Sequence, residues 1–185
     1  MEIFDVLRIQ KTQLIETKDI VSEFSKRLEE KSIINSGSKN FDKVLGGGFK
    51  KSQIYLIFGQ NRTGKTQLCH QLCIQAFKLF SEESNKFNIL YLDSENTFRP
   101  ERINQLCKSQ GLDSDAILKS IKVSNIMSNS ALLLVLNKLQ KKLEESSQNF
   151  VIIDSINNHY RSEQGDPNFK YKRVKNDFIL ILKKN

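Results

Sequence analysis

The sequence predicts an α/β fold in which a mainly parallel sheet is flanked by helices. Three apolar runs, at residues 54–58, 87–93 and 150–154, are typical of buried strands. Segments with helical spacing of apolar residues separate these runs, and this alternation favours parallel strands joined by helical crossovers. A glycine-bearing loop at residues 59–66 directly follows the first run and opens a helix, which is the context of a phosphate-binding loop.

Composition places the chain among globular proteins that suit a polyanionic partner. Its 185 residues are 38% hydrophobic and 27% charged, and the net charge of +8 suits nucleic acid. No apolar run has the length of a membrane span, and residues 1–10 lack the pattern of a secretory signal. Three cysteines are too few for a disulfide scaffold and favour a reducing, intracellular compartment. We expect the cytoplasm or nucleoid in a prokaryote and the nucleus in a eukaryote.

The N-terminal part of the chain is expected to lead into the core. Residues 1–35 mix charges with spaced apolar positions and predict a linker-like helical segment, followed by a partial core domain over residues 36–185. Ser38 is expected to cap a short helix that runs to Leu45, and the three glycines at 46–48 end that helix.

The loop at residues 59–66 has the full G-x-x-x-x-G-K-[ST] pattern. It consists of Gly59, Gln60, Asn61, Arg62, Thr63, Gly64, Lys65 and Thr66. The helix behind the loop has an apolar face, formed by Leu68, Leu72, Ala76 and Phe80. In such a loop the backbone N–H groups surround the phosphates, Lys65 brings positive charge to the β and γ phosphates, and the Thr66 hydroxyl binds Mg²⁺. We therefore expect the chain to bind a nucleoside triphosphate with Mg²⁺.

The later elements have clear boundary signals. Arg99 and Pro100 open a helix that Gly111 closes, and Ser130 is expected to cap a long helix. In chain order, the predicted elements are a strand at 87–93, a helix at 100–110, a short strand at 121–123, a helix from 131 to about 145, and a strand at 150–154. The carboxyl ends of parallel strands meet at one edge of a sheet, so we expect Asp93, Glu95 and Asp154 to gather beside the glycine loop.

Three acids in this group are candidates for the chemistry. Asp154 follows four apolar residues, which is the pattern of the acid that holds Mg²⁺ beside a phosphate loop. Hydrolysis needs a general base near the γ phosphate, and the residues alone leave both Glu95 and Asp93 open for that role. His70 and His159 are interpreted as structural, and Cys69 and Cys73 as core packing rather than metal ligands, because no further ligand cluster accompanies them.

Four segments, in this order, closely resemble the archaeal and eukaryotic RecA/RadA recombinases. They are SGSKNFDKVLGGG (36–48), FGQNRTGKTQLCHQLC (58–73), LYLDSENTFRPERI (90–103) and VIIDSINNHYRSE (151–163). Four ordered matches are far more specific than a phosphate loop alone. The resemblance implies a RecA-like P-loop NTPase core that uses ATP and Mg²⁺, polymerises on single-stranded DNA and pairs it with duplex DNA.

The resemblance also implies roles for individual residues. It makes Glu95 the catalytic glutamate, together with Lys65 of the loop. It makes Asp154 and Thr66 the Mg²⁺ ligands, and it makes Arg102 a contact to the adenosine of ATP. The implied enzyme activity is DNA-dependent ATP hydrolysis.

The sequence departs from the family pattern at both ends of the core. The family's N-terminal helix-hairpin-helix domain is not found, and the stretch 18–21 lacks both anchors of the Phe-x-x-Ala pattern, which weakens the expectation of self-association or of docking to a recombinase partner. The core is expected to be incomplete at the C-terminus, without the strand that normally lies between the glycine-loop strand and the Asp154 strand. The apolar run 178–182 is compatible with a helix or a strand.

The first DNA-binding loop departs as well. Residues 164–168 lack the family's arginine between glycines, and a nearby basic group is the candidate substitute. That group consists of Arg161, Lys170, Lys172 and Arg173. A solvated helix face is an equally good interpretation of these charges.

The sequence is compatible with three functions. The first is an ATP-dependent, DNA-binding recombinase-like protein of homologous recombination and DNA repair. The alternative is a catalytically impaired accessory protein that binds ATP and a recombinase partner without turnover. A P-loop kinase or an unrelated ATPase ranks last, because segments 36–48 and 98–102 have no evident role in it.

Overall fold

The computed structural model describes residues 33–83, 86–143, 148–156 and 158–159. In chain order its elements are β1 (Ile33–Ile34), α3 (Lys39–Val44), β2 (Phe49–Lys50), α4 (Lys65–Glu83), β3 (Phe87–Asp93), α5 (Pro100–Gln110), α6 (Ser114–Ser120), β4 (Ile121–Asn125), α7 (Asn129–Leu143) and β5 (Gln148–Asp154). The predictions for stretch 18–21, run 178–182 and the four basic DNA-binding candidates lie outside the described residues. None of the described helices has the length and apolarity needed to span a bilayer.

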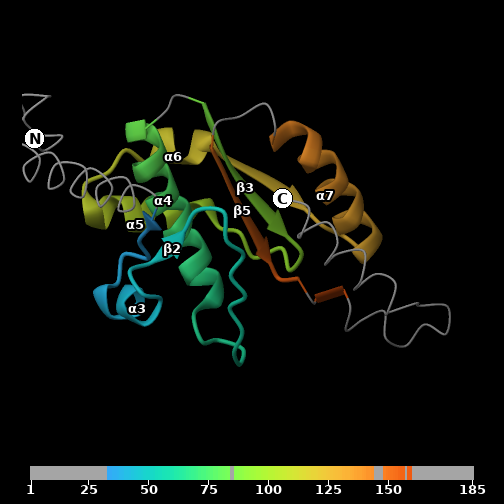
Figure 1. Ribbon diagram of the computed structural model, residues 1–185, viewed down its shortest axis with the longest axis horizontal. Coiled ribbons are helices and arrows are strands. Elements are labelled where there is room, and N and C mark those ends of the chain that lie inside the picture. Colours follow the sequence, from blue (N-terminus) through green and yellow to red (C-terminus); the bar gives the residue numbers. More distant parts are fainter. Residues whose placement is uncertain (1–32, 84–85, 144–147, 157, 160–185) are drawn as a thin grey trace, which may run out of the picture.

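The main sheet is parallel and has helices on both faces, as the sequence predicts. Its three strands lie in the order β4-β3-β5, and Asp93 at the end of β3 is in register with Asp154 at the end of β5. Helices α4, α5 and α6 cover one face, and α7 covers the other (Figure 1). The carboxyl ends of β3 and β5 therefore open at the same edge of the sheet.

Alternation along β3 divides the core between the two faces. Tyr91, which is completely buried, packs with α4 and α5, whereas Leu92 packs with Leu132 and Leu136 of α7. This period of two is expected for a strand that is covered on both sides. The predicted apolar face of α4 is confirmed, since Leu72, Ala76 and Phe80 are buried and Leu68 is partly buried.

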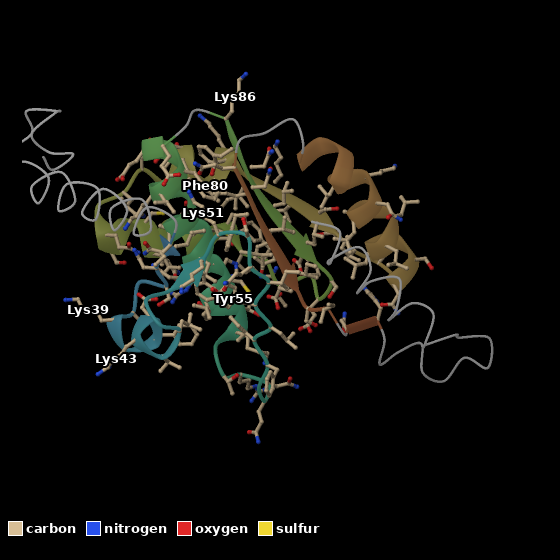
Figure 2. The ribbon with its side chains drawn as sticks, viewed as in Figure 1. Lys39, Lys43, Lys51, Tyr55, Phe80 and Lys86 are labelled. Atoms are coloured by element: carbon tan, nitrogen blue, oxygen red, sulfur yellow. The ribbon has the colours of Figure 1, made fainter. Side chains whose placement is uncertain are left out.

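A small antiparallel pair, β1 and β2, lies beside the end of α4. Gly48 has φ +133°, and a Cβ there would lie 2.8 Å from the Ile34 carbonyl oxygen, so the chain needs glycine at this turn. Lys51 follows β2, and its Nζ is 2.6 Å from Glu83 Oε2 and lies over the Phe80 ring (Figure 2). These contacts hold Lys51, at the start of the segment that leads from β2 to the glycine loop, against α4. Ile33 and Ile34 belong to the segment expected to be helical, but they form a strand.

The prediction of a buried strand at residues 54–58 is wrong. The segment has no regular secondary structure, and among the described residues no ladder joins it to β5 or to any other strand. Leu56 is 72% exposed and Phe58 is 86% exposed. Tyr55 attaches this segment to β2. Its ring packs edge-on against Phe49, and its hydroxyl accepts a hydrogen bond from the Lys50 N–H at 2.8 Å. A strand is held by backbone hydrogen bonds to a neighbour, and an apolar run does not supply the neighbour.

The ends of several helices agree with the signals in the sequence. Ser38 caps α3 by accepting from the Phe41 N–H, and Gly111 ends α5 in the left-handed conformation with φ +65°. The cap predicted for α7 at Ser130 is wrong, because α7 begins at Asn129 and the Ser128 hydroxyl oxygen accepts from the Ala131 N–H at 3.1 Å. Helix α6, which Asp113 caps, was not predicted.

Candidate nucleotide-binding and catalytic site

The glycine loop is an exposed turn at the start of α4. Arg62 and Gly64 have positive φ angles of 66° and 93°, which bend the chain into the helix. A Cβ on Gly59 would lie 3.3 Å from Thr63 Oγ1, so a side chain at this position would crowd the loop. The residues that the motif places in the loop therefore form a compact turn in front of a long helix.

Lys65 lies across its own loop. Its Nζ donates to the carbonyl oxygens of Gly59 at 3.0 Å and Gln60 at 2.8 Å, and the Thr63 hydroxyl also donates to the Gln60 carbonyl oxygen. The first turn of α4 contains no acidic residue. A helix N-terminus carries unpaired N–H groups and a partial positive charge, which attract anions. Loop, lysine and helix together present positive charge at one place.

The carboxyl ends of β3 and β5 bring the two principal acids together. The Ser155 hydroxyl, next to Asp154, donates to Glu95 Oε1 at 2.6 Å. Asp154 is buried, and its Oδ2 accepts from the Tyr91 hydroxyl at 2.8 Å. Glu95 lies on the exposed turn after β3. The expected gathering of acids at this edge of the sheet is confirmed, whereas Gly59 does not follow a strand.

Asp93 organises the turn that carries Glu95. Its Oδ1 accepts from the N–H groups of Glu95 at 3.2 Å and Thr97 at 3.1 Å, and its Oδ2 accepts from the Phe98 N–H at 2.8 Å. Asp93 is 2% exposed. Both of its oxygens face backbone donors, so its position suits a scaffold for the turn more than a proton acceptor.

Helix α4 faces this acidic edge through its second turn. Burial, and then the nearby Asp154 carboxylate, raise the pKa of the Cys69 thiol to about 12. His70 is 1% exposed, and burial lowers its pKa. Cys73 is fully buried in the core, as the sequence predicts. Among the described residues, no group of three His, Cys, Asp or Glu side chains is placed to hold a metal ion by itself.

Arg102 lies on α5 beside the first turn of α4. Its Nε donates to Gln67 Oε1 at 2.5 Å, and its Nη1 donates to Gln105 Oε1 at 3.0 Å. Gln67 directly follows the loop, so Arg102 is close to the loop's helical end. Its contact to adenosine stays a prediction.

Several residues of this edge were not singled out in the sequence. Ser94 and Ser155 join the two strand ends, because Ser94 Oγ donates to the Ser155 carbonyl oxygen at 2.6 Å and accepts from the Ser155 N–H at 2.9 Å. Tyr91 binds Asp154 across the sheet. The positions of Ser94 and Ser155 directly after the two acids are the signal that points to them, whereas Tyr91 lies inside an apolar run and has no such signal.

The chain is similar in sequence to proteins that are named for recombination and DNA repair. A family model described as Rad51 matches residues 26–177. The chain is 34% identical over 144 residues to the meiotic recombination protein DLH1 of Candida albicans, covering 76% of this chain and 44% of that protein. It is 32% identical over 164 residues to the DNA repair and recombination protein RadA of Cenarchaeum symbiosum, covering 85% and 41%. RadA of Aeropyrum pernix is 32% identical over 147 residues, covering 78% and 46%.

The chain thus spans less than half the length of these relatives. The matched region includes the glycine loop, the turn after β3 and the end of β5. The parallel sheet with helices on both faces agrees with this match. On sequence and fold together, the chain belongs to the Rad51 family of RecA-like proteins.

Proposed function

We propose that this chain binds ATP with Mg²⁺ at residues 59–66, hydrolyses it, and couples this to binding of single-stranded DNA in recombination and repair. One observation carries the proposal: Glu95 and Asp154, at the ends of neighbouring parallel strands, are linked through Ser155 beside the helix that bears the glycine loop. The relatives named for recombination and repair support the biological role.

The residues of the loop fit a triphosphate. The loop is exposed, glycine occupies the crowded position 59 and the positive-φ position 64, and the first turn of α4 has no acid to repel phosphate. The Lys65 ammonium donates to two loop carbonyl oxygens, and in the proposed complex it donates to phosphate oxygens instead. These features are what binding of phosphate by backbone and lysine requires.

Thr66 and Asp154 fit a magnesium ion that is shared with the nucleotide. Both offer oxygen ligands, which Mg²⁺ prefers, and proteins usually hold this ion by one or two side chains together with substrate phosphates. Such a site needs no cluster of three acids. When bound, Mg²⁺ would neutralise charge on the phosphates. Tyr91 holds the Asp154 carboxylate in place through its hydroxyl.

Glu95 is assigned as the general base. Its side chain is exposed at the edge of the sheet, and Ser155 holds one of its oxygens. A glutamate in this position would accept the proton of the attacking water as the water oxygen bonds to the γ phosphorus and the bond to the bridging oxygen of the departing ADP breaks. Arg102 is proposed to contact the nucleoside, and its hydrogen bond to Gln67, directly after the loop, supports this role.

DNA binding is proposed from charge and family. The net charge of +8 and the basic residues Arg161, Lys170, Lys172 and Arg173 suit a phosphate backbone. Affinity for single-stranded DNA is expected to fall steeply with salt, because neutralised phosphates release counterions. Binding to duplex DNA and to further copies of the chain or a recombinase partner belongs to the same proposal.

The decisive test is phosphate release from ATP, measured with and without single-stranded DNA. Glu95→Gln should lose about 10²–10⁴-fold in turnover while it retains nucleotide binding. Glu82→Gln is the matched control, since Glu82 is exposed at the far end of α4 and should keep the wild-type rate. If the wild-type chain binds ATP without measurable turnover, the proposal of ATP hydrolysis is contradicted and the accessory-protein alternative is supported.

A further inference from the structure

His70 makes two hydrogen bonds that fix which of its ring nitrogens carries the proton. Nδ1 lies 2.7 Å from the Thr66 carbonyl oxygen, and Nε2 lies 3.0 Å from the Arg99 backbone nitrogen, whose N–H points to it. A carbonyl oxygen only accepts and a backbone N–H only donates, so both bonds exist together only with hydrogen on Nδ1 and none on Nε2. The imidazole therefore joins α4 to Arg99, which lies 29 residues after His70 in the chain.

The Arg99 end of this link belongs to the turn that carries Glu95. Asp93 holds three backbone N–H groups of the turn from the β3 side, and His70 holds the next one, that of Arg99, from the α4 side. The Arg99 side chain closes the turn on itself, since its Nη1 donates to the carbonyl oxygens of Asn96 and Phe98. Anchoring Arg99 therefore anchors the whole turn.

Aromatic packing keeps the His70 ring in place. The Phe98 ring stacks on it with centroids 5.3 Å apart, and Tyr91, which binds Asp154, lies 5.8 Å away. The ring is almost completely buried, and this burial disfavours its charged form, in agreement with the neutral form that the two bonds require. At the other end of the link, Thr66 is both the last residue of the glycine loop and part of the first turn of α4.

We propose that His70 is a positioning residue which ties the helical end of the phosphate loop to the turn bearing Glu95 and so sets the spacing between bound nucleotide and base. This inference rests on the proposed function, because the spacing matters only if ATP is hydrolysed at this site. His70 touches neither substrate nor reacting atoms in this role; it acts through Arg99.

Two substitutions separate the two ends of the link. An asparagine amide reaches the position of Nδ1, so His70→Asn keeps a donor to Thr66 and loses the acceptor for Arg99. A glutamine amide reaches the position of Nε2, so His70→Gln keeps the acceptor for Arg99 and loses the donor to Thr66. Ile74→Val, one turn further along α4, removes buried volume but no hydrogen-bonding group, and serves as the stability control.

The expected kinetic result is a difference between the two variants in kcat and not in KM. His70→Asn should lower kcat for ATP hydrolysis by about tenfold, because the turn with Glu95 loses its anchor, and leave KM within about twofold. His70→Gln and Ile74→Val should keep kcat within about threefold of wild type. Equal losses in the Asn and Gln variants that follow their melting temperatures would overturn the inference, since they would indicate a purely structural histidine.

Hydrogen exchange of the Arg99 amide tests the link without any turnover. Exchange should be faster in His70→Asn than in the wild type and unchanged in His70→Gln; equal exchange in both variants would overturn the inference. If the wild type does not hydrolyse ATP but shows this pattern, the proposed function fails while the link stands. If neither variant folds, the ¹⁵N–¹H spectrum of the wild-type imidazole decides: hydrogen on Nδ1 supports the link, and hydrogen on Nε2 contradicts it.

Discussion

At the residue scale, Asp93 and Glu95 have different surroundings although they lie two positions apart. Asp93 is the last residue of β3, so the chain turns over its carboxylate and offers it three backbone donors. Glu95 lies on the exposed part of that turn and receives a hydroxyl from the neighbouring strand end. The residue pattern alone leaves both open as the base; Glu95, the base that we propose, is the one whose carboxylate is not engaged by backbone N–H groups of the turn.

Cys69 gives a prediction about pH. The thiolate is the form that reacts with iodoacetamide, and burial, followed by the nearby Asp154 carboxylate, raises the pKa of the Cys69 thiol from its usual 9.0 to about 12. Because the raised pKa leaves less thiolate at any pH below it, alkylation at pH 8 should be about 1,000-fold slower than in the unfolded chain. The rate should still increase about tenfold per pH unit up to pH 10. Mass spectrometry of the Cys69 peptide measures it, and a plateau near pH 9 would contradict the raised pKa.

At the scale of an element, the start of α7 offers a matched pair of serines. The Ser128 hydroxyl oxygen accepts from the Ala131 N–H, whereas Ser130 is exposed on the first turn of the helix. Ser128→Ala should lower the free energy of unfolding by about 0.5–2 kcal/mol, the usual cost of losing a helix cap. Ser130→Ala should change it by less than about 0.5 kcal/mol. Denaturant unfolding measures both; a larger loss at Ser130 would restore the cap predicted from the sequence.

Elements whose limits depend on local signals were predictable. The strand at 87–93 has the bounds given by its apolar run, and α5 begins at Pro100 and ends before Gly111, because proline and glycine act on their own backbone. The observed cap of α7, Ser128, lies two residues before the predicted cap, Ser130. Both are serines with the same capping chemistry, so the residue type alone does not show where the helix begins. Helix α6 was not predicted because its 7 residues are too few to show a clear helical period of apolar positions.

Residues 54–58 show what a local pattern does not determine. The run has the composition of a buried strand, yet Ile54 is 65% exposed and the described residues provide no neighbour on the free side of β5. Pairing is a property of the sheet, so an apolar run of this kind forms a strand only where a neighbouring strand is available to it.

At the scale of the whole molecule, the candidate site is the meeting point of α4, β3 and β5. The sequence predicted which ends meet, because parallel strands direct their carboxyl ends to one edge. It did not predict the links that hold them, such as Tyr91 to Asp154 or His70 to Arg99, since these join residues 63 and 29 positions apart. Such contacts depend on how helix and sheet pack, and neither partner has a local pattern that reveals the other.

This assembled site predicts stabilisation by its ligand. Mg²⁺ with a slowly hydrolysed ATP analogue at 100 times Kd should raise the free energy of unfolding by about 2.7 kcal/mol, because the ligand binds only the native chain. The melting temperature, measured by calorimetry, should rise by about 5–10 °C. Lys65→Ala should lose most of this rise, since it removes the charge that the loop offers to phosphate. Lys39→Ala is the matched control, because Lys39 points outward from α3, away from the loop (Figure 2). An undiminished rise in Lys65→Ala would mean that the nucleotide binds elsewhere on the chain.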